Sequence, residues 1–290
     1  MWIVFACGSA LFAGITAVLA KEGIRTTDST VATALRTVVV LAGAWGMVFI
    51  VGSQGELAHL DARSTGLLVL SGLATGASWL CYFKALQLGS VSKVVPIDKL
   101  STVLTVLLAL IFLGERVSLI GALGVALIAV GTLLMLDADD LRGLPRAVRD
   151  GGGWLLYALG SAFFAALTAI LGKAGITGVE SNLGTAIRTG VVLVMAWVMV
   201  AVTGKLREVR TVPRGELGFV LASGAATCAS WLCYYRALQD GPASVVVPID
   251  KLSVLVTVLF SALVLHEAVS RRYLIGLALL VGGTLAMLLL

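Results

Sequence analysis

An eight-residue stretch that combines a proline with two charged residues occurs twice inside apolar sequence. Residues 94–101 read Val-Val-Pro-Ile-Asp-Lys-Leu-Ser, and residues 246–253 repeat them at a spacing of 152 (248 − 96 = 152). Both copies lie near the start of a hydrophobic segment that is long enough to cross a membrane. An ionisable side chain there costs roughly 3 kcal/mol even on lenient insertion scales. Charges in such a place therefore indicate a specific role.

The composition indicates a polytopic membrane protein. Of the 290 residues, 59% are hydrophobic and 13% are charged, and the mean hydropathy is +1.03. A soluble domain could not hide that much apolar surface from water. Ten segments have the ~20 apolar residues that cross ~30 Å of hydrocarbon. These segments are 2–20, 31–52, 65–83, 90–113, 117–136, 154–172, 183–203, 216–235, 242–265 and 273–290.

The two halves of the chain are copies of one another. Residues 1–138 align with residues 153–290 at the constant offset of 152 without a gap, and roughly half of the aligned pairs are identical. Similarity of this extent indicates duplication. The polar segment between the copies has the composition of a linker. The predicted domains are a first repeat over 1–137, a linker over 138–153 and a second repeat over 154–290.

Five spans in each repeat predict that the repeats lie in opposite orientations. A repeat that crosses the membrane an odd number of times ends on the far side, so the next copy starts inverted. The loop charges agree, since the loop after the second span has only Arg63 while the matching loop of the second half has four basic residues. Basic loops stay on the cytoplasmic side, so both termini are expected outside. The predicted fold is an all-α membrane protein with ten transmembrane helices in two inverted-topology five-helix repeats.

The motifs of each half resemble the EamA domain of the drug/metabolite transporter superfamily. Each half has an arginine in its second span, a Gly-rich third span ending in Cys-Tyr, a proline in its fourth span and a glutamate after it. The matching positions are Arg36, Cys81, Tyr82, Pro96 and Glu115 in the first half, and Arg188, Cys233, Tyr234, Pro248 and Glu267 in the second. The resemblance covers essentially the whole chain. It implies two inverted five-helix repeats, a central cavity between them and alternating access.

The charged stretch has a functional and a structural interpretation. The prolines Pro96 and Pro248 lack the N–H of a helical residue, so a hinge or break is expected at each. Broken helices near a repeat axis are where transporters commonly bind substrates. In the functional interpretation the charges bind substrate or carry protons. In the structural one, each aspartate pairs with the lysine of the other copy. The four charges are Asp98, Lys99, Asp250 and Lys251.

Two arginines are further candidates for the lining of a cavity. Arg36 and Arg188 lie a few residues into their spans. Their side chains either snorkel to the membrane surface or face the cavity. If they face it, these two cations and the two lysines outnumber the two aspartates. That surplus favours an anionic or zwitterionic substrate.

A polar stripe at helical spacing marks the third span and its copy. Its residues are Ser71, Thr75, Ser78 and Tyr82, and then Ser223, Thr227, Ser230 and Tyr234, with Trp79 and Trp231 beside them. A shorter stripe of Ser9 and Thr16 is repeated as Ser161 and Thr168. Polar groups in lipid surroundings must face helices or water. The stripe therefore lines a cavity or forms hydrogen bonds between helices, and the tryptophans belong to the cavity wall or to the apolar core.

The sequence predicts no catalytic residue, metal site or cofactor. It contains no phosphate-binding loop, zinc-binding helix motif or nucleophile elbow. Basic patches with interleaved aromatic residues, which nucleic acid would need, are absent. The first span has no acidic residue, whereas the small multidrug-resistance branch of the resembled superfamily carries its proton-exchanging carboxylate there. A drug-cation/proton antiport of that type is therefore disfavoured.

The predicted function is secondary transport and not catalysis. We expect an exporter or facilitator of a small polar metabolite, such as an amino acid or a related anionic or zwitterionic compound, working by alternating access. The alternatives are a proton-coupled exporter of cationic drugs or toxic compounds, and a non-transporting membrane scaffold. The expected partners are a small-molecule substrate, protons and membrane lipid, with no nucleic acid. The protein is expected to act as a monomer in a cytoplasmic membrane of bacterial or archaeal type.

Overall fold

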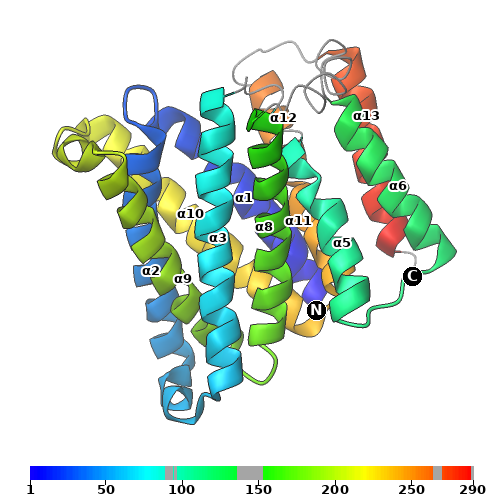
Figure 1. Ribbon diagram of the computed structural model, residues 1–290, viewed down its shortest axis with the longest axis horizontal. Helices are drawn as coiled ribbons and strands as arrows, with labels where there is room; N and C mark the ends of the chain where they lie inside the picture. Colours follow the sequence, from blue (N-terminus) through cyan, green and yellow to red (C-terminus); the bar gives the residue numbers. More distant parts are fainter. Residues whose placement is uncertain (89–93, 95–96, 136–152, 264–269, 289–290) are drawn as a thin grey trace.

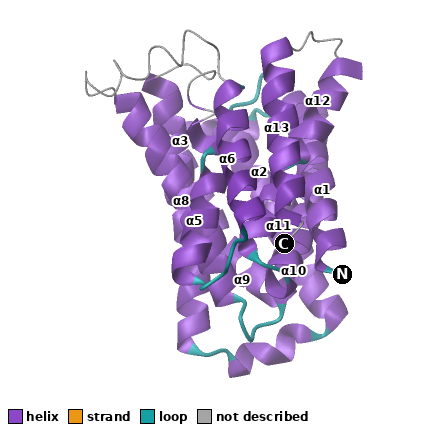
Figure 2. Cartoon of the chain, turned by 90° about the vertical axis from the view of Figure 1, so that its right-hand side faces the viewer, coloured by secondary structure: helices purple, strands orange, loops and turns teal. Residues whose placement is uncertain are grey.

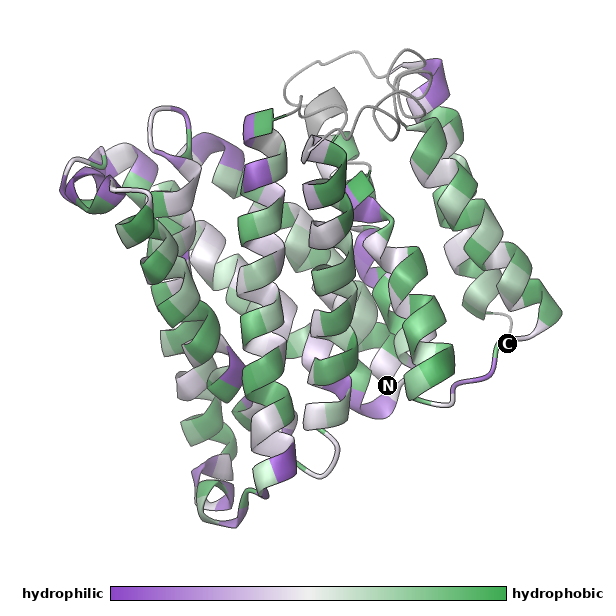
Figure 3. Cartoon of the chain, in the orientation of Figure 1, coloured by the Kyte–Doolittle hydropathy of each residue, from purple (hydrophilic) through white to green (hydrophobic). Residues whose placement is uncertain are grey.

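The chain forms a bundle of helices in the computed structural model, which describes residues 1–88, 94, 97–135, 153–263 and 270–288 (Figure 1). This part of the chain contains no strand. Most helices run up or down through the molecule (Figure 2). Apolar residues cover their middle parts, and hydrophilic residues gather mainly at their ends (Figure 3). This distribution is the one that a bilayer imposes on helices that cross it.

Each half contributes a similar series of helices. The first half has α1 (Trp2–Gly23), α2 (Ser29–Val51), η1 (Ser53–His59), α3 (Ala62–Leu88), α5 (Ser101–Phe112) and α6 (Leu119–Leu134). The second half has α8 (Gly153–Gly175), α9 (Ser181–Val202), η2 (Lys205–Arg210), α10 (Arg214–Asp240), α11 (Ala243–Lys251), α12 (Ser253–Leu263) and α13 (Arg271–Leu288). Within the ranges given above, seven helices have the length and apolarity of membrane spans: α1, α2, α3, α8, α9, α10 and α13. The predicted spans at 90–113, 117–136 and 242–265 contain shorter helices.

Helices from the two halves pack against one another in a reciprocal way. α3 packs against α8, and its copy α10 packs against α1, which is the counterpart of α8. α2 packs against its own copy α9 at one edge of the molecule, and α6 packs against its own copy α13 at the opposite edge (Figure 1). Reciprocal contacts of this kind are those that a two-fold relation between equivalent units produces.

Glycines bring α6 and α13 into backbone contact. A Cβ added to Gly124 would lie 2.6 Å from the carbonyl oxygen of Gly283, and one added to Gly131 would lie 2.5 Å from that of Gly276. The lower residue number on α6 faces the higher one on α13, so these two helices run antiparallel. Small residues allow such close packing where lipid gives helices no hydrophobic reason to associate.

The helices that carry the predicted arginines begin at equivalent acidic caps. Asp28 accepts hydrogen bonds from the N–H groups two and three residues later, at the start of α2. Glu180, at the equivalent position (28 + 152 = 180), does the same for α9. A carboxylate at this place satisfies N–H groups that have no partner inside the helix. The caps fix where the helices of Arg36 and Arg188 start.

In the second half, the expected helix break does not lie at the proline. Pro248 lies inside α11, which continues to Lys251. The break comes at Leu252, whose N–H donates to the carbonyl of Ile249, three residues earlier (2.9 Å). Pro248 lacks the N–H that would bond the carbonyl of Ser244, but α11 continues for three residues beyond it. The equivalent break in the first half comes at residue 100, and Pro96 lies outside the described residues.

Candidate functional site

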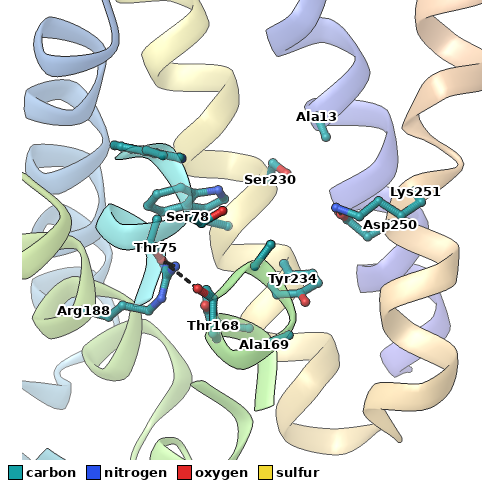
Figure 4. Close-up of a pocket in the computed structure, with 14 residues that line it drawn as sticks. Ala13, Thr75, Ser78, Thr168, Ala169, Arg188, Ser230, Tyr234, Asp250 and Lys251 are labelled. Atoms are coloured by element: carbon teal, nitrogen blue, oxygen red, sulfur yellow. Dashed lines mark hydrogen bonds and ion pairs between the residues drawn. The ribbon is translucent and has the colours of Figure 1, made fainter. Parts of the chain in front are cut away.

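A cavity of about 240 Å³ lies between the two halves of the chain (Figure 4). Its wall comes from α1 and α3 of the first half and from α8, α9, α10 and α11 of the second. Arg188 and Asp250 lie on opposite sides of the view in Figure 4, so opposite charges approach the cavity from two directions. Nine of the predicted residues line it: Thr75, Ser78, Trp79, Arg188, Ser230, Trp231, Tyr234, Asp250 and Lys251.

Five other predicted residues do not line this cavity. They are Arg36, Tyr82, Asp98, Lys99 and Thr227. Tyr82 packs beside an apolar cluster that includes Ala85 and Ile97. Lys99 lines a second cavity of about 80 Å³, which Lys251 also borders. The cavity between the halves is therefore built unequally, with the charged groups of the second half facing it and those of the first half set away from it.

Each aspartate of the repeated stretch accepts a hydrogen bond from the other half. Ser161 donates to Asp98 Oδ1 at 2.6 Å, and Ser9 donates to Asp250 Oδ1 at the same distance. The Oγ atoms of Ser161 and Ser9 lie 3.3 Å from those of Ser78 and Ser230, respectively. These serines belong to the predicted polar stripes and are buried. The hydrogen bonds compensate in part for holding a carboxylate away from bulk water.

The lysines do not form the ion pairs across the repeat axis that the structural interpretation expects. Among the described residues, Lys251 lies near the aspartate of its own copy, with 3.8 Å between Lys251 Nζ and Asp250 Oδ2. Neither Asp98 with Lys251 nor Asp250 with Lys99 comes within ion-pair distance in this part of the chain. Neighbouring residues on a helix diverge by 100°, but the four-carbon stem of a lysine is long enough to curl back. The described charges are therefore not arranged as a crossed pair.

Arg188 is a buried cation at the wall of the cavity. Its side chain is 2% exposed, and it donates from Nε to Ser71 Oγ at 3.0 Å and from Nη2 to Thr75 Oγ1 at 2.6 Å. Its Nη1 is buried and has no partner in the described chain. The rings of Trp231 and Tyr235 each lie 4.9 Å from Arg188 Cζ, close enough for cation–π attraction. Arg188 therefore faces the cavity and does not snorkel to the surface.

The polar stripes both line the cavity and join helices. Ser78 donates to the carbonyl of Ser161 at 3.0 Å, and its copy Ser230 donates to that of Ser9 at 3.1 Å. Both serines also line the cavity. The two interpretations of the stripe are thus compatible, since a hydroxyl can donate to a neighbouring helix and still accept from the cavity side.

Two polar residues of the wall, Tyr235 and Thr168, were not among the predicted site residues. Tyr235 follows the predicted Tyr234 and packs on Arg188, whereas the equivalent first-half residue is Phe83. Its place off the polar stripe gave no periodic signal. Thr168 belongs to the shorter polar stripe, and its Oγ1 lies 3.3 Å from that of Thr75. Thr168 could have been predicted from that stripe.

Comparison with known proteins identifies the family. The model of the EamA-like transporter family matches residues 1–137 and 152–289. The chain belongs to the EamA-like transporter family. With seven helices of membrane-spanning length and apolarity among its described residues, this EamA-like protein is an integral, multi-pass membrane protein and a membrane transporter.

A half-length relative and a solved structure are similar to this EamA-like transporter. A protein of Sinorhizobium sp, described as an uncharacterized transporter in the cobO 3' region, is 46% identical over 134 residues. The aligned residues are 46% of this chain and 95% of that protein, so the relative corresponds to about one repeat. A crystal structure described only as that of a protein has a TM-score of 0.73 at 20% identity, covering 98% of this chain and 95% of its own. At that identity the likeness concerns the fold alone.

Proposed function

We propose that this EamA-like transporter is a secondary transporter that moves a small polar metabolite across the membrane by alternating access. The substrate is an amino acid or a related anionic or zwitterionic compound. The observation that carries this proposal is Arg188, a buried guanidinium without a carboxylate partner in the described chain, at a cavity that Asp250 also lines. A compound with an acidic group and an amine could satisfy both charges at once.

The proposed architecture is ten transmembrane helices in two inverted five-helix repeats. The repeats cover 1–137 and 154–290, and residues 138–153 link them. The antiparallel packing of α6 against its own copy α13 supports an inverted relation. The Sinorhizobium relative, which corresponds to about one repeat, supports the repeat as a separate unit. The start of α1 and the end of α13 both lie toward the lower side of the bundle in Figure 1, which supports an even number of crossings.

The hydroxyl-bound aspartates support a proposal for coupling to protons. Asp250 lies at the cavity, at the C-terminal end of α11, and accepts from Ser9. We assign coupling to Asp250, which lines the cavity and is held there by Ser9, with Asp98 as its counterpart in the other half. Export of cationic drugs is the weaker alternative, because Arg188 would repel a cation from the same cavity.

Flux measurements in proteoliposomes test the proposal. Vesicles would be loaded with radiolabelled L-leucine, L-glutamate or benzoate, and counterflow would be compared with that of a cationic dye. We expect counterflow of at least one carboxylate, and its loss in Arg188→Gln. The exposed Arg63→Gln is the matched control for loss of a guanidinium and should retain flux. Flux of the cation alone, unaffected by Arg188→Gln, would contradict the proposed substrate class.

A further inference from the structure

The two equivalent arginines have different surroundings in this conformation. Arg188 donates to Ser71 and Thr75 on α3 and lines the cavity. Arg36 is half-buried on α2 and does not line the cavity. In the described part of the chain, its guanidinium has no hydrogen bond or ion pair. Identical residues at equivalent positions of the two halves thus have different surroundings within one conformation.

The hydroxyl groups equivalent to the hydrogen-bond acceptors of Arg188 also differ in their contacts. By the offset of 152, the counterparts of Ser71 and Thr75 are Ser223 and Thr227. Ser71 donates across the halves to the carbonyl of Thr168 at 2.8 Å, whereas Ser223 donates within its own helix to the carbonyl of Val220 at 2.7 Å. Thr227 Oγ1 lies 3.3 Å from Thr16 Oγ1, as Thr75 Oγ1 lies from Thr168 Oγ1, so the difference between the two pairs is at Ser223, which does not donate to the other half as Ser71 does.

The two ends of the molecule also differ in the contacts that equivalent residues make. Gln239 donates to the carbonyls of Ile176 and Val179, which joins the end of α10 to the loop after α8. Its counterpart Gln87 is exposed and accepts from Lys84. Ile176 is 1% exposed, while its counterpart Ile24 is 40% exposed. The surface near Ile176 is thus closed, and the equivalent contacts at the surface near Ile24 are not made.

We infer that Arg188 and Arg36 alternate as the anchor for an acidic group in the cavity. In the conformation described here, Arg188 joins α9 to α3 and offers Nη1 to a carboxylate. When the surface near Ile176 opens, Arg36 donates hydrogen bonds to Ser223 and Thr227, the counterparts of the present acceptors of Arg188. The inference rests on the proposed transport function and deepens it, because it assigns the carboxylate of the substrate to one arginine in each state.

The energetics favour such an exchange. A buried guanidinium without a counter-ion is destabilising, and two of them at once would be more so. A carboxylate can pair with one arginine in each state, while the other arginine keeps a minor part of its side chain exposed. The aromatic faces on Arg188 stabilise the cation between ligands. Their counterparts, Trp79 and Phe83, are aromatic too, so Arg36 would find similar neighbours.

Cysteine labelling tests the exchange without any substrate. In a background in which the native cysteines are replaced, Ile176→Cys or Ile24→Cys would be reacted with N-ethylmaleimide in detergent. The native cysteines are Cys7, Cys81, Cys228 and Cys233. We expect slow reaction at position 176 and fast reaction at position 24. Adding Arg188→Gln should raise the rate at position 176 at least about threefold, because the present state loses two hydrogen bonds.

Arg36→Gln is the decisive comparison. It should leave the rate at position 176 unchanged or lower it, because it weakens the alternative state only. Arg63→Gln should have no effect on either rate. Should Arg188→Gln fail to fold, the double variant Ser71→Ala with Thr75→Val removes the same contacts. Equal rates in the two arginine variants, or a faster rate in Arg36→Gln alone, would overturn the exchange.

A second measurement tests the ligand chemistry. Thermal stabilisation by L-leucine, L-glutamate and benzoate would be compared with that by their amides. We expect any stabilisation to be stronger for an acid than for its amide, and to be lost in Arg188→Gln. Amides that stabilise as strongly as the acids would overturn the assignment of a carboxylate. Because labelling needs no substrate, failed labelling with intact flux removes the exchange only, and absent flux with the expected labelling removes the transport proposal only.

Discussion

Glu115, at the end of the fourth predicted span, caps the helix of the other half that begins at Ala243. Its Oε1 accepts from the N–H of Ala243 at 2.7 Å, and its Oε2 accepts from the next N–H at 2.9 Å. Lys173 Nζ lies 4.0 Å from Oε1 and also donates to the carbonyls of Leu238 and Gly241. The cap therefore joins three segments at the start of α11, the helix that carries Asp250.

Replacing Glu115 with alanine is expected to destabilise the protein by about 1–2 kcal/mol, because two N–H groups of α11 lose their acceptor. Glu115→Gln keeps one acceptor oxygen, so its stability should lie between that of Glu115→Ala and that of the unchanged protein. The measurement is the melting temperature in detergent. Glu208→Ala, at an exposed glutamate, is the control and should not shift it. Equal melting temperatures for Glu115→Ala and Glu208→Ala would contradict the importance of the cap.

Gly131→Ala is expected to separate α6 from α13. The new methyl group would lie 2.5 Å from the carbonyl oxygen of Gly276, which must move away. Overpacking of this kind costs about 1–3 kcal/mol. Gly282→Ala, on the facing helix, is the matched control, because nothing lies within 4 Å of the added group. Thermal unfolding should show a lower midpoint for Gly131→Ala only, and similar midpoints would show that the two helices do not pack so closely.

Reversing the charges of Asp98 and Lys251 tests the crossed ion pair. Since these side chains are not within ion-pair distance, Asp98→Lys and Lys251→Asp should each destabilise the protein and should not rescue one another. The expected coupling energy is below about 0.5 kcal/mol, as for sites without direct contact. The stabilities of the two single variants and the double variant give that energy. A double variant more stable than either single one would restore the crossed pair.

The lowered pKa of the Asp28 carboxyl predicts how the stability of the protein responds to acid. Burial raises the pKa of this carboxyl, but hydrogen bonds from Lys205 and from the amides of Thr30 and Val31 outweigh that effect and lower it below its usual value. The stabilisation is complete above the pKa of an unfolded aspartate and is lost as the pH falls below about 4. Asp28→Asn should cost about 0.5–1 kcal/mol at pH 7 and much less at pH 3. Melting temperatures of both proteins across this range measure the difference.

The duplicated pattern allowed the family and much of the cavity wall to be predicted. Ser78, Trp79 and their copies line the cavity, as a polar stripe with adjacent tryptophans indicated. The inequality between the halves could not be predicted, because one repeated sequence cannot show which copy is engaged in a given conformation. Arg188 and Arg36 are identical residues at equivalent positions, and only their surroundings differ.

The position of the helix break was also beyond the sequence. Pro248 indicated a break at itself, but α11 continues through it to Lys251. The start of α11 is capped by Glu115, a residue far away in the chain. Local signals of this kind specify that a helix is interrupted, while contacts across the fold decide where.

The reciprocal packing of the two halves has a consequence for synthesis in the cell. α1 packs against α10, and 190 residues lie between the end of one and the start of the other (214 − 23 − 1 = 190). At about 5–20 residues per second, α1 leaves the ribosome on the order of 10–40 s before its partner. During that interval its small and polar face can meet only lipid or insertion machinery. Premature truncation of the chain would leave this face unprotected and open to quality-control proteolysis.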